Sequence, residues 1–159
     1  MNQISATAQL AMPRAEAWAK LRDLKLGQYY VPRVTRIEIT TPQREGVGAS
    51  RRAFCKGRPP VDETVVLWEE GRGFTVKLHN GDKPPAPFKQ AQFTYWLDDA
   101  PGGQTRISTT IAYEMPFGIV GRLLDALLLR RLMRTTVNTI ARGLKQFYET
   151  GKSANPLVA

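Results

Sequence analysis

The chain has 159 residues, the size of one ordinary domain, and a domain of this length hides about 70% of its unfolded surface, so one core is expected. Its only cysteine, Cys55, excludes an internal disulfide. The net charge of +9 is compatible with an acidic partner, an anionic surface, an anionic ligand or simple solubility, and it selects none of these.

No targeting or membrane segment is expected. The first 18 residues lack the basic leader and the uninterrupted apolar block of a secretory signal. The longest apolar region, Ile119 to Met133, is interrupted by Arg122, Asp125, Arg130 and Arg131, whereas a bilayer span needs about 20 mostly apolar residues. With a single cysteine and no Asn-x-Ser/Thr site, we expect a cytoplasmic, soluble protein.

The first predicted elements are a strand and two short helices. Residues 3–12 mix β-branched and small residues without a helical stripe, which favours a strand. Pro13 then opens "PRAEAWAKLRDL", in which Trp18 and Leu21 share one helical face. A second short helix is expected over residues 24–30.

Six further segments have strand character and are separated by turns rich in Gly and Pro. They cover residues 33–40, 48–56, 61–70, 73–80, 89–99 and 104–115. A long helix follows and ends near Gly151. Because helices do not alternate with these strands, the pattern predicts an antiparallel sheet with its helices on one face, an α+β fold. We expect one domain over residues 1–150 and a flexible C-terminal tail over 151–159.

Several stretches, in this order, carry a resemblance to a known group of proteins. They are "PRAEAWAKLRD", "GVGASR", "DETVVLWEE", "GGQTRI" and "PFGIVGRLL". Together with the order of elements, they resemble the START/Bet v 1-like (SRPBCC) helix-grip superfamily, and more narrowly its bacterial polyketide cyclase/dehydrase-like branch. The resemblance implies a curved seven-stranded sheet wrapped around the long helix, with an apolar cavity between them. Members bind lipids, hormones or flavonoids, or catalyse aromatic cyclisation, so it implies no particular ligand.

Alternation along the strands predicts which side chains form the cavity wall. The last strand presents Ile107, Thr109, Ile111, Tyr113 and Met115 on one side, and the neighbouring strands present Phe74, Val76, Leu78, Ala91, Phe93, Tyr95 and Leu97. The candidate ligand-binding residues taken from this wall are Phe74, Val76, Leu78, Phe93, Tyr95, Ile111 and Tyr113, with Leu124 added from the long helix. Alternatively, the same side chains simply fill the core.

Two charged residues are predicted to point toward this wall. Arg51 shares its side of the strand with Ala53, and Glu63 shares its side with Leu67. A buried charge is costly unless it is paired, so each should have a partner or hold the polar end of a ligand. One hypothesis is that Arg51, Glu63 and Tyr113 orient an amphipathic ligand. The alternatives are a structural Arg51–Glu63 bridge, or two side chains that both lie in solvent.

The sequence contains no recognisable catalytic constellation, and the catalytic residues stay unassigned. The only histidine, His79, is predicted to face water, and neither a metal site nor a cofactor is expected. The leading interpretation is a binding protein for a lipid or an aromatic, polyketide-like molecule. The first alternative is a polyketide cyclase or dehydratase that uses the same cavity, with Glu63 as acid or base and Arg51 stabilising an enolate. Nucleic-acid binding is not expected, because the charge comes without a recognition motif.

The long helix has two apolar faces that do not match. Val120, Leu123, Leu124, Leu127 and Leu128 cluster on one side of a helical wheel, and Met133, Val137, Ile140, Leu144 and Phe147 cluster about half a turn away. We therefore predict a change of direction or partner near Leu129 to Met133, with the second half gripping the sheet. The first half, the Leu-rich strip Val120 to Leu128, then either caps the cavity or lies exposed. An exposed strip would suit a homodimer, a membrane surface or a ligand entrance, and so a lipid-surface or partner-binding module is a further alternative.

Overall fold

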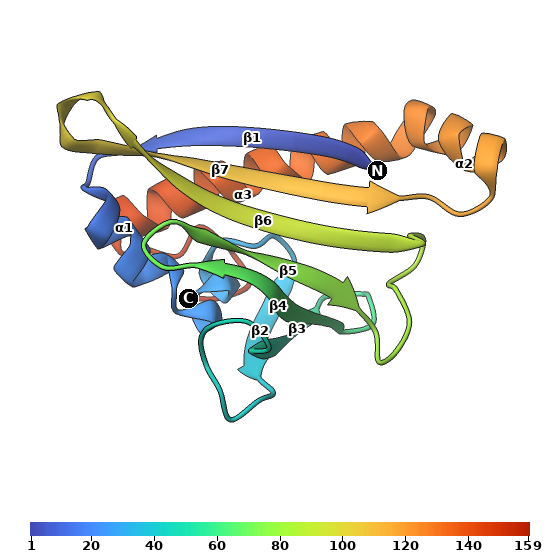
Figure 1. The fold of residues 1–159 in the computed structure, drawn as a ribbon, viewed down its shortest axis with the longest axis horizontal. Helices are drawn as coiled ribbons and strands as arrows, with labels where there is room; N and C mark the ends of the chain where they lie inside the picture. Colours follow the sequence, from blue (N-terminus) through green and yellow to red (C-terminus); the bar gives the residue numbers. More distant parts are fainter.

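Seven strands form one antiparallel sheet in the computed structural model, which describes residues 1–159 (Figure 1). They are β1 (Asn2–Leu10), β2 (Val34–Ile39), β3 (Ser50–Cys55), β4 (Val61–Glu69), β5 (Gly73–His79), β6 (Gln90–Ala100) and β7 (Gln104–Glu114). Their order across the sheet is β1-β7-β6-β5-β4-β3-β2, so β2 to β7 form a meander and β1 pairs with β7 alone. The predicted antiparallel sheet is confirmed.

The helices lie before and after the meander. Helix α1 (Arg14–Leu21) and the 3-10 helix η1 (Leu24–Tyr29) connect β1 to β2, and the 3-10 turn η2 (Pro101–Gly103) connects β6 to β7. The C-terminal helix consists of α2 (Gly118–Leu124), the π-helical turn η3 (Asp125–Leu129) and α3 (Arg130–Thr150). Figure 1 shows α3 running along one face of the sheet, where it packs mainly on β1 and β7. This is the helix-grip α+β arrangement that was predicted.

The sequence of α3 accounts for its position and its end. Met133, Val137, Ile140 and Leu144 recur at helical spacing and are all buried against the sheet. The helix ends at Gly151, whose φ of 71° is the left-handed conformation that glycine adopts without strain. Its N–H donates to the Phe147 carbonyl at 2.8 Å, which closes the last turn.

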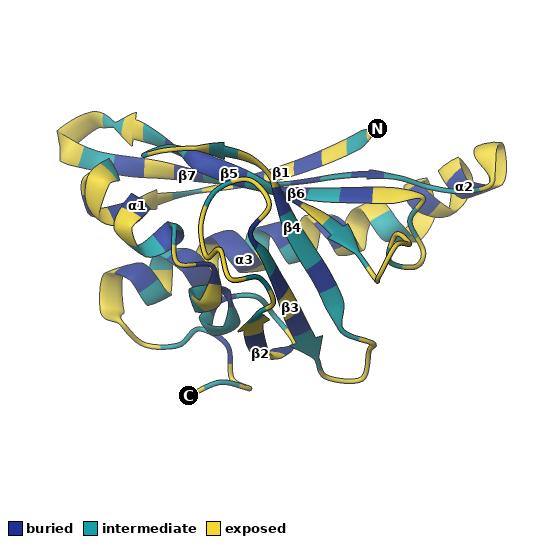
Figure 2. Cartoon of the chain, turned by 60° about the horizontal axis from the view of Figure 1, so that its bottom comes forward, coloured by how far each residue is buried: buried dark blue, intermediate teal, exposed yellow.

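The inner face of the sheet is apolar and aromatic, as alternation predicted. Buried residues on β5, β6 and β7 include Phe74, Val76, Ala91, Phe93, Tyr95, Leu97, Ile107, Thr109, Ile111 and Tyr113. Figure 2 shows the resulting alternation of buried and more exposed positions along the strands. The rings of Phe74 and Phe93 pack on Tyr95, with centroids 5.2 and 4.8 Å away. These side chains therefore fill much of the interior with one another.

Alternation fails at one point in β4. The pairing with β5 shifts register between Val65 and Leu67, which is the signature of a β-bulge. Beyond the bulge Leu67 turns outward and is 46% exposed, while Trp68 packs against the core and stacks on Phe74. The predicted inward side chain of Leu67 is therefore wrong, and Trp68 takes its place.

The last residues fold back onto the domain, although the sequence had suggested a flexible tail. Asn155 is only 2% exposed. Its side-chain amide donates to the carbonyls of Gln28, Val31 and Val34 at 2.8, 3.2 and 2.7 Å. The two N–H groups of this amide are shared among three carbonyl groups around the start of β2, and this ties the tail to the domain.

The change of direction in the long helix is present and lies slightly earlier than predicted. The π-helical turn covers Asp125–Leu129, just before the expected Leu129 to Met133. A π turn holds more residues than an α turn, so it changes which side of the helix faces the sheet. As a result Gly121 and Asp125 are buried while the Leu-rich strip lies exposed. None of the helices is long and apolar enough to cross a membrane.

Candidate functional site

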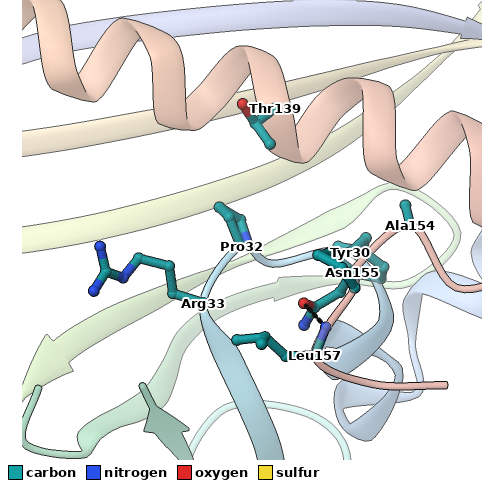
Figure 3. A pocket seen from close by; sticks show the side chains of 8 residues that line it. Tyr30, Pro32, Arg33, Thr139, Ala154, Asn155 and Leu157 are labelled. Carbon is teal, nitrogen blue, oxygen red and sulfur yellow. Dashed lines mark hydrogen bonds between the residues drawn. The ribbon is translucent and has the colours of Figure 1, made fainter. Parts of the chain in front are cut away.

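A pocket lies where α3, the turn between η1 and β2, and the C-terminal tail meet (Figure 3). Its volume is about 340 Å³, at the small end of the range for ligand pockets. The residues that line it are Tyr30, Pro32, Arg33, Thr139, Ala154, Asn155, Pro156 and Leu157. Most of this lining consists of apolar carbon, and Arg33 is its one charged residue.

Local backbone features bring the three segments together. Arg33 has a φ of 68°, an uncommon conformation for a residue other than glycine, and it turns the chain from η1 into β2. The Ala154 N–H donates to the Tyr29 carbonyl at 2.9 Å, which holds the tail beside η1. Gly143 lets α3 approach closely, because a Cβ there would lie 3.1 Å from the Tyr30 carbonyl oxygen. Figure 3 shows the pocket residues between α3 and the tail.

Two of the predicted polar residues form an ion pair in the interior. Arg51 is 1% exposed, and its Nε donates to the Glu63 carboxylate at 2.6 Å. One of its terminal nitrogens donates to the Leu24 carbonyl at 2.5 Å. Burial opposes the charge on Arg51, but the Glu63 carboxylate outweighs it, so the pKa of Arg51 is raised. Both residues therefore face inward, as alternation predicted, and the guanidinium stays charged.

Three tyrosines surround this pair. The ring of Tyr30 lies 6.4 Å from that of Tyr95 and 6.0 Å from that of Tyr148, both edge-on. Burial raises the pKa of all three hydroxyls, so they stay neutral. The Tyr148 hydroxyl is fully buried and close enough to Tyr30 to influence its pKa, but it makes no hydrogen bond of ordinary geometry. Since Tyr30 also lines the pocket, this polar cluster lies directly behind the pocket wall.

Tyr113, the third predicted polar residue, lies in a different cluster. Its hydroxyl donates to the Asp125 carboxylate, which also accepts a hydrogen bond from the Asn2 side chain at 2.9 Å. Burial and then Asp125 raise the pKa of Tyr113, while Arg130 approaches the same carboxylate at 3.9 Å. The structure therefore does not unite Arg51, Glu63 and Tyr113, because alternation predicts the face of a side chain but not its position along that face.

The predicted wall residues lie apart from the pocket. Phe74, Val76, Phe93, Tyr95 and Ile111 are buried in the core, and none of them lines it. Leu124, the predicted contact from the long helix, is 48% exposed and also lies outside it.

Leu78 lines a second pocket of about 450 Å³ beside β4 and β5, together with His79. His79 was predicted to face water, and in the structure it is partly exposed. One of its ring nitrogens is 2.8 Å from the Thr64 hydroxyl and the other 2.8 Å from the Gly81 carbonyl. Its ring is therefore held by two hydrogen bonds.

Sequence reasoning missed Tyr30, Thr139, Tyr148 and Asn155. Tyr148 continues the buried helical spacing of Ile140 and Leu144, so periodicity predicts its burial but not its unpaired hydroxyl. No pattern in the sequence points to Asn155, because the three carbonyls that it binds become neighbours only after folding.

A family model described as polyketide cyclase/dehydrase and lipid transport matches residues 1–149. The chain belongs to this family. Membership supports binding of hydrophobic molecules in general and agrees with the branch of the helix-grip superfamily predicted from the sequence. No curated protein matches the chain.

Solved structures share the fold of this polyketide cyclase/dehydrase family member. The protein TTHA0849 from Thermus thermophilus is 24% identical, with a TM-score of 0.70, over 96% of this chain and 100% of its own. XoxI from Bacillus cereus is 10% identical, with a TM-score of 0.73, over 94% and 97%. Ara h 8.0201 is 13% identical, with a TM-score of 0.62, over 90% and 97%. At these identities the similarity establishes the helix-grip fold alone.

Proposed function

We propose that this protein binds an amphipathic small molecule with an acidic end, in the pocket between α3 and the C-terminal tail. The observation that carries the proposal is the composition of the pocket: Pro32, Pro156 and Leu157 provide apolar walls, and Arg33 provides a cation. Arg33 is exposed and makes no ion pair, and its one hydrogen bond goes to the Lys56 carbonyl at 3.2 Å. A small pocket with apolar walls and few polar groups is typical of ligand sites.

Each side of the pocket has a distinct role in this proposal. The apolar part of the ligand packs against Leu157 and Pro156, and its carboxylate pairs with the guanidinium of Arg33, which offers two or more donors in one plane. The aromatic rings of the interior pack on one another, so we place the ligand at the pocket and not behind it. Membership in a family described by cyclase, dehydrase and lipid-transport proteins supports a hydrophobic cargo.

The first test fills the pocket with a larger side chain. Thr139 lies on the exposed side of α3 and lines the pocket, whereas Thr135, one turn earlier, does not. Calorimetric titration with dodecanoate should show affinity lost in Thr139→Trp and retained in the control Thr135→Trp. Equal affinity in both variants would place the ligand elsewhere.

The second test concerns the acidic end of the ligand. Dodecanol has the same chain as dodecanoate but no charge, and an ion pair at an exposed site contributes about 1 kcal/mol or less. We expect dodecanoate to bind about three- to five-fold more tightly than dodecanol, and Arg33→Asn to remove this preference. Asn is chosen because it tolerates the positive φ at this position. A preference that survives the substitution would contradict the role of Arg33.

A further inference from the structure

The Leu-rich strip is an outward-facing apolar surface on α2 and η3. Leu127 and Leu128 are 68% and 70% exposed. Phe117, Ile119 and Leu132 extend the same surface and are at least half exposed. Figure 2 shows α2 as a largely exposed segment at the end of the molecule, and Figure 1 shows that it projects beyond the sheet. A contiguous apolar surface of this kind marks an interaction site.

The helix cannot turn these leucines inward. Gly121 is buried against Pro116, and a Cβ at this position would overlap the Pro116 carbonyl. Asp125, 3% exposed, is held by hydrogen bonds from Tyr113 and Asn2. Rolling the helix would break both bonds and move a carboxylate out of its paired site. The small and acidic residues therefore fix the inner side, and the apolar side remains available to a partner.

On the helix itself, the exposed charges around the strip have a single sign. Arg122, Arg130, Arg131 and Arg134 are all exposed. Between Met115 and Tyr148 the only acidic residue is the buried Asp125. A second copy packed on this surface would bring arginines against arginines without an acid to pair them. A layer of anionic lipid head groups, by contrast, complements every exposed charge.

We propose that α2 and η3 dock on the surface of an anionic lipid bilayer. The leucines and Phe117 enter the boundary between head groups and acyl chains, as the apolar face of an interfacial helix does. The arginines keep their guanidinium groups at the level of the phosphates while their stems lie along the apolar surface. Each such cation strengthens the attraction to an anionic leaflet. This docking does not depend on the ligand pocket.

The test is co-sedimentation of the whole protein with vesicles of phosphatidylcholine alone and of equal parts phosphatidylcholine and phosphatidylglycerol. The variant is Leu123→Asp/Leu127→Asp. The control, Val47→Asp/Leu67→Asp, places the same two charges at exposed apolar positions outside the strip. We expect binding to the anionic vesicles, at least about a ten-fold weaker partition for the variant, and no change for the control. Added salt should weaken the binding.

Three outcomes would overturn the proposal. They are an absence of wild-type binding to anionic vesicles, equal binding to neutral vesicles, and equal losses in variant and control. The other possible occupant of the strip is a second copy of this chain, and sedimentation equilibrium tests for it. If the wild type is a dimer that does not bind vesicles, and Leu123→Asp/Leu127→Asp is a monomer, then a second copy covers the strip. Dodecanoate titration of the same variant should be unchanged, which separates this result from a failure of the pocket.

Discussion

Arg51 and Glu63 show how a single pair of side chains can be either a structural bridge or part of a binding site. The guanidinium is bound by Glu63 and by the Leu24 carbonyl. Removing one member of a buried pair is costly because the other charge is left unpaired, whereas replacing both with apolar residues is often tolerated. This difference separates the two interpretations.

Arg51→Met is expected to lower the free energy of unfolding by about 3 kcal/mol, because it leaves Glu63 unpaired. The double variant Arg51→Met/Glu63→Leu should recover most of this loss. Urea unfolding measures both variants, and dodecanoate titration of the double variant shows whether the pair also contributes to binding. Affinity unchanged from wild type would establish the pair as structural, and affinity lost from a stable double variant would show a role in binding.

For single residues, the sequence predicts well which face of a strand a side chain points to, and it predicts poorly which groups that side chain contacts. Alternation placed Arg51 and Glu63 inward because β3 and the first half of β4 are regular. It failed at Leu67, where the bulge shifts the register by one residue. It did not find Tyr148, because an unpaired hydroxyl depends on which groups of other elements lie nearby.

The C-terminal helix is the element in which local sequence and tertiary packing differ most. Up to Val137 its buried residues are Gly121, Asp125, Met133 and Val137, which are separated by multiples of four. An α-helix has 3.6 residues per turn, so this spacing drifts around the axis unless a wider turn compensates. The π turn at Asp125–Leu129 supplies the wider turn. The mismatch of the two apolar faces was therefore visible in the sequence, while the choice of Asp125 for the inner face was not.

Asp125→Ala should loosen the first part of the helix while α3 stays folded. The substitution leaves the buried Tyr113 hydroxyl without its acceptor, at a cost of about 1–3 kcal/mol. Hydrogen exchange should become faster in α2 and η3 and remain slow in α3. Asp125→Asn is the matched control, because its amide oxygen still accepts from Tyr113. Exchange unchanged in Asp125→Ala would mean that packing of Gly121, and not the carboxylate, holds this segment.

In the whole molecule, the tail completes both the domain and the pocket. Residues 154–157 form one side of the pocket, and Asn155 ties them to the turn that carries Arg33. A short segment without periodicity predicts flexibility, and this is why the sequence alone suggested a tail. The antiparallel sheet and the helix on its face, by contrast, follow from long patterned segments and from the family resemblance.

Asn155→Asp should unfold at lower denaturant concentration and bind dodecanoate more weakly. The side chain keeps its shape, but a carboxylate has no donor for the carbonyls of Gln28, Val31 and Val34, so we expect a loss of about 2–3 kcal/mol. Lys152→Gln also lowers the net charge by one, at an exposed position of the tail, and should behave like wild type. Equal stability of the two variants would show that the tail contributes little to the fold.

The position of β1 has a consequence for synthesis of the chain. It pairs only with β7, the last of the seven strands to be synthesised, so β1 has no neighbour in this sheet until the other strands have emerged. Contacts so distant in sequence form slowly, and an unpaired strand edge can pair with another nascent chain. The outward side chains of β1 are Gln3, Ser5, Thr7 and Gln9, and two of its four inward ones, Ile4, Ala6, Ala8 and Leu10, are alanines. This modest hydrophobicity suits a strand that must stay free of other chains until the sheet closes on it.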